Sequence, residues 1–370
     1  MEISAVGILG AGTGSASLAV KAAASGLQVR IYDLFKDSLK NTAASVEWRL
    51  EQLGKSELSS NIEFVQDCEK LSGAEILLET PARSEDERAL RLNKACRAVD
   101  KSCLLGLCSG VEVLEPVTRE LPVPERLLGI AFARPVAKNK LVELVRLERT
   151  SESTLNTASE FMRRIGKTPV MVKDMPGLIV ERLRCPYHLA ALRMLEVGKG
   201  APSRIDAAAK KLGGFAMGPF ESMDEIGLDA DWRAAEYLYQ ALGRPERLKP
   251  AACENRLAQY GQLGRKSTVG FYFYEDGDIS GHNPDLRGVV PYLGIAPVSD
   301  EVIFGALIQP VIEEAHLAAT EGLLSEYDVD VAAKLGLGWP KGPFALEREK
   351  ADLLDSVRRQ SKKDPWGDAV

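Results

Sequence analysis

The sequence predicts an α/β fold in which an N-terminal doubly wound, Rossmann-type sheet is followed by two repeated all-α modules. Three observations lead to this prediction. Short apolar runs alternate with amphipathic stretches in the first half of the chain, a glycine-rich turn follows the first apolar run, and the second half contains an internal repeat. The chain has 370 residues, which is enough for two or three domains with a core each.

Apolar runs of strand length recur through the first half of the chain. The predicted strands are Ala5–Leu9, Gln28–Tyr32, Ile62–Val65, Ile76–Glu79, Cys103–Leu107, Leu127–Ala133, Leu141–Leu147 and Thr168–Val172. Longer amphipathic stretches between most of them predict helices at Ser15–Ser25, Asp37–Leu53, Asp86–Ala98 and Ser153–Ile165. This alternation is typical of a mostly parallel sheet that is covered by helices on both faces.

The second half of the chain contains a duplicated segment. Residues 186–220 align without gaps onto residues 310–344, and 11 of the 35 positions are identical, including a shared Gly-Pro-Phe. About two identities are expected by chance, so duplication of one helical module is the simplest interpretation. We expect domains at residues 1–176, 177–280 and 295–370, with Asp276–Pro297 as the linker between the copies.

Composition excludes several classes of protein. The formal net charge is −6, from 47 basic and 53 acidic residues, which gives no electrostatic basis for nucleic-acid binding. No apolar run approaches the roughly 18 residues of a membrane span, and the start of the chain lacks the basic region of a signal peptide. We therefore expect a cytoplasmic protein. Its six cysteines form no Cys-x-x-Cys pair, so we expect neither a metal site nor disulfide bonds.

A glycine-rich turn, Gly10–Gly14, follows the first predicted strand. Gly10 permits a tight turn, and Gly12 has no side chain to block a pyrophosphate, at which the following helix directs its free N–H groups. Asp33 lies 21 residues beyond Gly12, where an acidic residue binds the ribose hydroxyls and favours NAD over NADP. The alternative is a vestigial loop that no longer binds a nucleotide. The residues predicted to bind NAD are Gly10, Gly12, Thr13, Gly14, Asp33 and Glu79.

Motifs along most of the chain point to one family. They are the glycine turn itself, Leu141–Val145, Ile165–Gly177, Ile205–Asp206, Met217–Phe220, Gly264–Lys266, Gly270–Tyr272 and Gly336–Phe344. With these motifs the chain resembles the NAD-dependent L-3-hydroxyacyl-CoA dehydrogenases. The resemblance implies a small-molecule substrate, an acyl-CoA or a hydroxy acid. In single-module relatives the helical domain commonly forms a dimer, and a duplicated module satisfies that surface within one chain, so we expect a monomer or a homodimer.

The catalytic centre of the family is altered in this chain. There, a histidine takes the proton of the 3-hydroxyl while hydride leaves for the nicotinamide, and a glutamate orients the histidine. The stretch that opens with this histidine reads Ala131-Phe132-Ala133-Arg134-Pro135 here. Alanine therefore stands at the position of the base, Arg134 replaces an asparagine, and the glutamate is retained as Glu143. Losing a general base typically lowers the rate by about 10²–10⁴-fold.

Two further polar positions complete the predicted catalytic set. The substrate-contacting serine of the family corresponds to Ser109, if one extra residue downstream is allowed, and the asparagine before Arg182 is Glu181. None of the three histidines of the chain matches a catalytic position of the family. Cys108 lies in the same turn as Ser109, and we interpret it as a packed thiol rather than a nucleophile.

The resemblance leaves several functions open. The first is an oxidoreductase with a rebuilt base, either Glu181 or Glu143. The second is a catalytically silent pseudoenzyme that binds NAD or acyl-CoA, and the third is non-redox acyl-CoA chemistry on the same fold. Arg134 either pairs with a glutamate or holds a substrate carboxylate. We expect a salt bridge from Arg134, because Glu143 without its histidine would otherwise be an unpaired buried charge.

Overall fold

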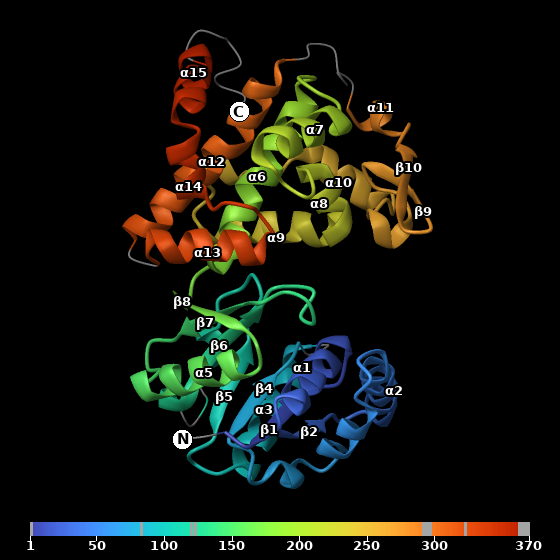
Figure 1. Ribbon diagram of the computed structural model, residues 1–370, viewed down its shortest axis with the longest axis vertical. Helices are drawn as coiled ribbons and strands as arrows, with labels where there is room; N and C mark the ends of the chain where they lie inside the picture. Colours follow the sequence, from blue (N-terminus) through green and yellow to red (C-terminus); the bar gives the residue numbers. More distant parts are fainter. Residues whose placement is uncertain are drawn as a thin grey trace. The chain divides into compact units, whose positions relative to one another are not determined.

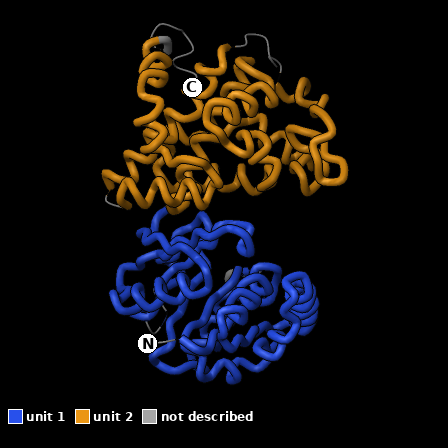
Figure 2. The backbone as a smooth tube through the Cα atoms, viewed as in Figure 1, with its two compact units in different colours: residues 1–175 blue, residues 176–370 orange. Residues whose placement is uncertain are grey.

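The computed structural model describes residues 3–81, 84–118, 121, 124–290, 298–321 and 324–361. The chain divides into two compact units, residues 1–175 and 176–370 (Figure 2). The first unit contains the sheet, and the second is mainly helical (Figure 1).

The first unit is built on an eight-stranded sheet with the order β3-β2-β1-β4-β5-β6-β7-β8. The strands are β1 (Ala5–Leu9), β2 (Gln28–Tyr32), β3 (Ile62–Val65), β4 (Ile76–Glu79), β5 (Leu104–Cys108), β6 (Leu127–Phe132), β7 (Leu141–Arg146) and β8 (Thr168–Lys173). Every neighbouring pair is parallel except β6 and β7, which are antiparallel. Parallel neighbours need crossover connections, and helices between the strands provide most of them. The predicted fold class is therefore confirmed.

Helices α1 (Thr13–Ala24), α2 (Lys36–Gln52), α3 (Glu85–Ala98), α4 (Glu115–Thr118) and α5 (Glu152–Arg164) connect the strands. The main core of this unit joins β1, α1 and α5, with Ile8, Ala19 and Leu155 fully buried. All four residues of β4 are buried. The central strands are therefore apolar on both faces, as is typical of a parallel sheet covered by helices.

The second unit contains most of the helices of the chain. It comprises α6 (Leu178–Glu196), α7 (Pro202–Gly213), α8 (Pro219–Ile226), α9 (Leu228–Ala241), α10 (Ala252–Gln259), β9 (Tyr272–Glu275), β10 (Asp278–His282), α11 (Leu286–Val289), α12 (Asp300–Thr320), α13 (Glu326–Gly336), α14 (Pro343–Glu349) and α15 (Ala351–Ser361). The segment expected to link the two copies, Asp276–Pro297, is structured in its first part. There β10 pairs with β9 in an antiparallel hairpin and α11 follows, whereas residues 291–297 lie outside the described part of the chain.

The two copies of the repeat use the same helix cap. The Asp206 carboxylate accepts hydrogen bonds from the backbone N–H groups of Phe220 (2.9 Å) and Glu221 (3.1 Å). In the second copy, Asp330 accepts from Phe344 (2.9 Å) and Ala345 (3.1 Å). A Cβ on either preceding glycine would collide with the backbone of that aspartate. Both copies therefore need a glycine at this point, because in each of them two helices approach closely in the same way. This explains why Gly-Pro-Phe occurs in both.

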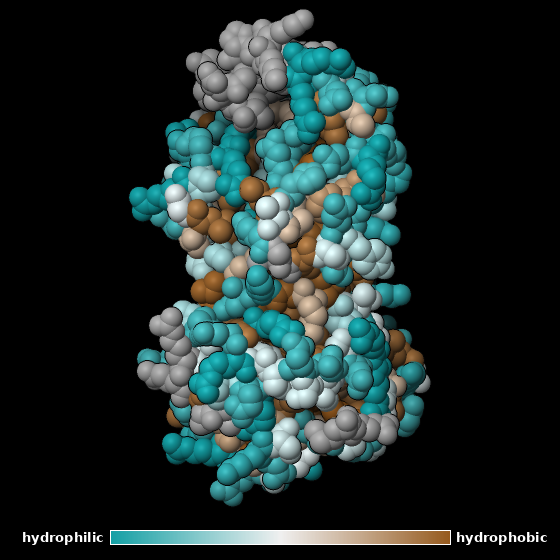
Figure 3. Space-filling model, turned by 90° about the vertical axis from the view of Figure 1, so that its left-hand side faces the viewer, coloured by the Kyte–Doolittle hydropathy of each residue, from teal (hydrophilic) through white to brown (hydrophobic). Residues whose placement is uncertain are grey.

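Helix α12 is the core helix of the second unit. It alone among the described helices has the length and composition of a membrane span, but 56% of its most apolar window is buried inside the protein. Ile303, Phe304, Leu307 and Val311 are fully buried, and the helix packs against α6 and α7. On the face shown in Figure 3, hydrophilic side chains predominate, with apolar ones distributed between them.

Candidate functional site

The glycine turn has the conformation that a pyrophosphate site requires. Gly10 has a φ of +103°, which favours glycine, and a Cβ there would collide with the guanidinium of Arg91. Gly12 is extended, and a Cβ added there or at Gly14 would meet no atom within 4 Å among the described residues. Ser15, in place of the family's third glycine, donates from its hydroxyl to the Gly10 carbonyl at 2.7 Å. Protein atoms therefore pack against the turn at Gly10, whereas the space next to Gly12 is free of described atoms.

Helix α1 leaves its N-terminal N–H groups available. Its cap residue, Gly12, makes no side-chain hydrogen bond in the described structure, and its first turn holds no acidic residue. The first N–H groups of a helix have no intrahelical acceptor and carry the positive end of the helix dipole. An anion such as a pyrophosphate accepts hydrogen bonds from these N–H groups and is attracted by the dipole. The residues present therefore fit NAD at this position.

Asp33 lies at the end of β2 and supports the turn. Its carboxylate accepts hydrogen bonds from the backbone N–H groups of Ala11 (2.7 Å) and Phe35 (2.8 Å). Each oxygen has a second lone pair, so the same group can still accept a hydrogen bond from a ribose hydroxyl. Asp33 is buried beside the turn, and its binding of a ribose stays a prediction.

Glu79, at the end of β4, is surrounded by protein groups. Arg88 donates to both of its oxygens at 3.0 Å, and the backbone N–H of Cys108 donates at 2.8 Å. Arg91, which also donates to the Thr80 carbonyl, approaches to 3.5 Å. We therefore expect Glu79 to act on the cofactor only indirectly, by holding β4, β5 and α3 around the glycine turn.

We expect replacement of Gly12 with alanine to weaken NAD binding at least tenfold, because the methyl group enters the open side of the turn. The extended backbone accepts any residue, so the free energy of unfolding should change by less than about 1 kcal/mol. Calorimetric titration with NAD and denaturant unfolding measure the two quantities. Gly281→Ala, also in open space but on β10 of the other unit, is the matched control. Unchanged NAD affinity in Gly12→Ala would exclude this turn as the pyrophosphate site.

Three of the expected catalytic positions, 109, 131 and 143, lie on or directly after neighbouring strands. Ala131 on β6 and Glu143 on β7 are direct partners in the antiparallel pair, so their side chains share one face with Cβ atoms about 4.5–5.5 Å apart. Ser109 follows β5, and its N–H donates to the Ile130 carbonyl at 3.0 Å. The structure thus brings Ser109 and Glu143 to either side of the position that holds histidine in the family.

The Ser109 hydroxyl is an unusual feature of this sheet edge. It is buried, and it makes no hydrogen bond to any residue that the structure describes. An unsatisfied buried hydroxyl destabilises a protein by roughly 1–3 kcal/mol. A ligand oxygen or an ordered water is needed to satisfy it. The adjacent Cys108 thiol behaves as expected, because burial, with the charge of Glu79, raises its pKa to about 12 and keeps it protonated.

Arg134, from which a salt bridge to Glu143 was expected, is exposed, whereas Glu143 is buried. Arg134 lies in the loop between β6 and β7, which Lys167 holds by donating to the carbonyls of Val136 (2.6 Å) and Asn139 (2.7 Å). This loop sets the exposure of Arg134, which the sequence pattern alone did not show.

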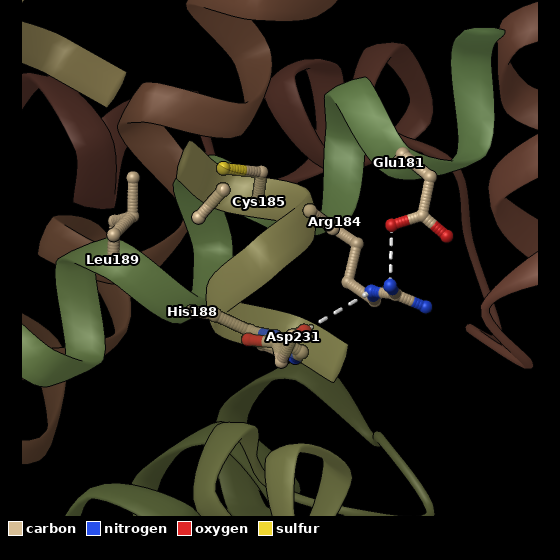
Figure 4. Close-up of a pocket in the computed structure, with 8 residues that line it drawn as sticks. Glu181, Arg184, Cys185, His188, Leu189 and Asp231 are labelled. Atoms are coloured by element: carbon tan, nitrogen blue, oxygen red, sulfur yellow. Dashed lines mark hydrogen bonds and ion pairs between the residues drawn. The ribbon is translucent and has the colours of Figure 1, made fainter. Parts of the chain in front are cut away.

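Glu181 belongs to the second unit, where it lies in the first turn of α6. Its carboxylate forms an ion pair with Arg184, one turn further along the helix. Figure 4 shows these two side chains pointing toward each other, with His188 and Asp231 close by. A shallow pocket is lined by Glu181, Arg184, Cys185, His188, Leu189, Asp231, Ala234 and Ala235.

The polar groups around Glu181 were not predicted. A signal was present, because Glu181, Arg184 and His188 are spaced by three and four residues and so share one face of a helix. The partners from other helices, such as Asp231 on α9, have no such local signature. Their contribution depends on how distant segments pack.

A Rossmann-type sheet with an uncapped helix after β1 and an aspartate after β2 defines a dinucleotide-binding oxidoreductase, and NAD is the cofactor. Residues 5–175 match the family model of the 3-hydroxyacyl-CoA dehydrogenase NAD-binding domain, and residues 177–274 match that of the C-terminal domain. The chain belongs to the 3-hydroxyacyl-CoA dehydrogenase family.

Individual relatives agree with this assignment. The chain is 30% identical to 3-hydroxyadipyl-CoA dehydrogenase of Escherichia coli over 282 residues, which cover 74% of this chain and 59% of that protein. It is 29% identical to the mitochondrial hydroxyacyl-coenzyme A dehydrogenase of Sus scrofa, over 73% of this chain and 91% of the relative.

Two solved structures share the fold. A 3-hydroxybutyryl-CoA dehydrogenase from Escherichia coli superimposes with a TM-score of 0.86 at 23% identity and covers 99% of this chain and 96% of its own. An (S)-3-hydroxybutyryl-CoA dehydrogenase from Ralstonia eutropha superimposes with a TM-score of 0.71 at 27% identity. It covers 74% of this chain and all of its own.

Proposed function

We propose that this protein transfers hydride between NAD and a hydroxyacyl-CoA thioester or a related hydroxy acid, with a carboxylate in place of the family's histidine. The buried Ser109 hydroxyl carries the proposal. It lies beside position 131 with no hydrogen-bond partner among the described residues, which is the state expected of a group that binds a substrate oxygen. The names of the relatives, which are dehydrogenases of hydroxyacyl-CoA compounds, support the substrate class.

When bound, NAD accepts the hydride that leaves the substrate carbon. The protein must bind the substrate oxygen and accept its proton. We propose that Ser109 hydrogen-bonds to that oxygen and that a carboxylate accepts the proton, with Glu181 as the first candidate. Glu143 is the second candidate, but it occupies the place of the orienting glutamate beside Ala131.

The wild-type protein tests the proposal directly. It should form NADH when supplied with NAD and one of a set of 3-hydroxyacyl-CoA thioesters, including a set member with a terminal carboxylate. Calorimetry with NAD and with acetoacetyl-CoA measures binding separately. Tight binding of both compounds without turnover in either direction would favour the pseudoenzyme.

Replacement of Ala131 with histidine restores an imidazole directly opposite Glu143. We expect this variant to reduce acetoacetyl-CoA at least tenfold faster than the wild type, because the imidazole recovers general acid catalysis. NADH consumption measures the rate, and Ala133→His in the loop after β6 is the control. A rate that stays at the wild-type value would show that the pocket, and not only the base, has changed.

A further inference from the structure

A polar cluster inside the second unit extends from Glu181. Along α6, the side chain of Glu181 is 23% exposed, that of Arg184 is 17% exposed and that of His188 is 2% exposed. The three polar side chains therefore run from the partly exposed start of the helix into the core (Figure 4).

Arg184 is shared between two carboxylates. Its Nη2 pairs with Glu181, and its Nε lies 3.6 Å from Oδ1 of Asp231 on α9. Asp231 is in turn held by His188, whose Nδ1 lies 2.9 Å from both carboxylate oxygens. The positive charge that stabilises ionised Glu181 is thus divided with a second, buried anion.

Glu254 on α10 adds a proton to this cluster. It is fully buried, and burial together with the negative charge of Asp231 raises its pKa well above the ordinary value. Burial opposes ionisation of Asp231 too, but His188 and Arg184 together lower the pKa of this aspartate. Asp231 is therefore the anion, and Glu254, whose oxygens have no hydrogen-bond partner among the described residues, stays protonated beside it.

The duplicated module shows that the fold does not need these charges. Within the repeat, His188 corresponds to Ile312. Arg184, which lies two residues before the repeat begins, corresponds at the same offset to Ile308. Both isoleucines are buried in α12. Buried charges in one copy, where the other copy packs aliphatic side chains, call for an explanation other than folding.

The cluster also contains a serine, but its surroundings do not suit acyl transfer. The Ser222 hydroxyl lies 3.1 Å from Nε2 of His188, which completes a Ser-His-Asp series. The N–H groups of Phe220 and Glu221 donate to Asp206, and that of Ser222 donates to the Gly218 carbonyl. These backbone donors are therefore not available to stabilise an oxyanion.

We propose that Asp231, held by His188, strengthens Glu181 as a proton acceptor by competing with it for Arg184. This inference rests on the proposed role of Glu181. An anion that draws on the guanidinium leaves less positive charge to stabilise ionised Glu181, so the carboxylate takes up a proton more readily. Asp231 and His188 are positioning residues, because they act through Arg184. The titratable groups facing the cluster are Glu181, Arg184, Cys185 and His188 on α6, Asp224 on α8, Asp231 on α9 and Glu254 on α10.

Two variants should move the titration of Glu181 in opposite directions. Arg184→Gln should raise its midpoint by about one pH unit or more, because the cation is lost. Asp231→Asn should lower it by about half a unit, because the competitor is lost. Carboxyl ¹³C NMR of the full chain, with the Glu181 signal identified through Glu181→Gln, measures both without requiring turnover. Arg184→Lys should restore most of the wild-type midpoint, and Arg233→Gln, an exposed arginine of α9, is the control.

The outcomes separate this inference from the proposed function. Opposite shifts support the inference, and shifts in the same direction, or none, overturn it. If Asp231→Asn does not fold, a midpoint that is unchanged in Arg184→Gln overturns it equally. Where the wild type turns over, the acidic limb of the kcat/KM profile should shift as the NMR midpoint does. A wild type that titrates as expected but oxidises no thioester removes the proposed function and leaves the electrostatic coupling in place.

Discussion

Replacing Glu181 with glutamine is expected to lower kcat for oxidation of a hydroxyacyl thioester by roughly 10²–10⁴-fold, the range typical for loss of a general base. The amide keeps the size of the side chain and can still accept a hydrogen bond from Arg184, but it cannot take up a proton. Because Glu181 and the glycine turn belong to different units, NAD affinity should stay within about twofold of the wild type.

The measurement is steady-state formation of NADH over a pH range, with calorimetric NAD binding in parallel. Glu152→Gln is the matched control, because Glu152 also pairs with an arginine but is exposed on α5. Wild-type turnover in Glu181→Gln would remove this residue from the mechanism. A comparable loss in Glu143→Gln, and not in Glu181→Gln, would assign the proton to the glutamate opposite Ala131.

The second large effect concerns stability. Replacing Arg182 with alanine is expected to lower the free energy of unfolding by about 3–5 kcal/mol, because it leaves a buried carboxylate poorly compensated. Arg182 on α6 is 2% exposed and pairs with Glu314, which is 1% exposed on α12 of the second copy. Arg247 shares Glu314 at 2.9 Å, and Glu321 contacts Arg182 at 2.9 Å. This network joins the two modules across their interface.

Denaturant unfolding measures the effect, and Arg146→Ala is the control. Arg146 also forms a bidentate pair with a glutamate, but its side chain is 44% exposed, so its loss should change stability by about 1 kcal/mol at most. Replacing Arg182 and Glu314 together by leucine should recover much of the loss, since no charge is then left buried. Equal effects of Arg182→Ala and Arg146→Ala would contradict a role for burial in this network.

The sequence predicted where some candidate site residues lie on the sheet, but not the partners of others. The resemblance placed Ser109 and Glu143 at the edge where β5, β6 and β7 lie together. It did not show that Arg134 is exposed or that the oxygens of Glu79 are already occupied by Arg88. Family motifs predict where a residue lies on the backbone of the fold. The partners of its side chain depend on loops and helices that the motifs do not specify.

The sequence by itself determined the strands of the sheet, the NAD-binding turn and the duplication of the helical module. Each rests on a pattern in the sequence: apolar runs that alternate with amphipathic stretches, glycines directly after the first strand, and a Gly-Pro-Phe that occurs twice at one offset. Only the tertiary structure decided that position 131 faces Glu143, and that His188, Asp231 and Glu254 gather behind Glu181. These groups come from segments distant in the chain, and their pairing is set by strand register and helix packing, which no local pattern encodes.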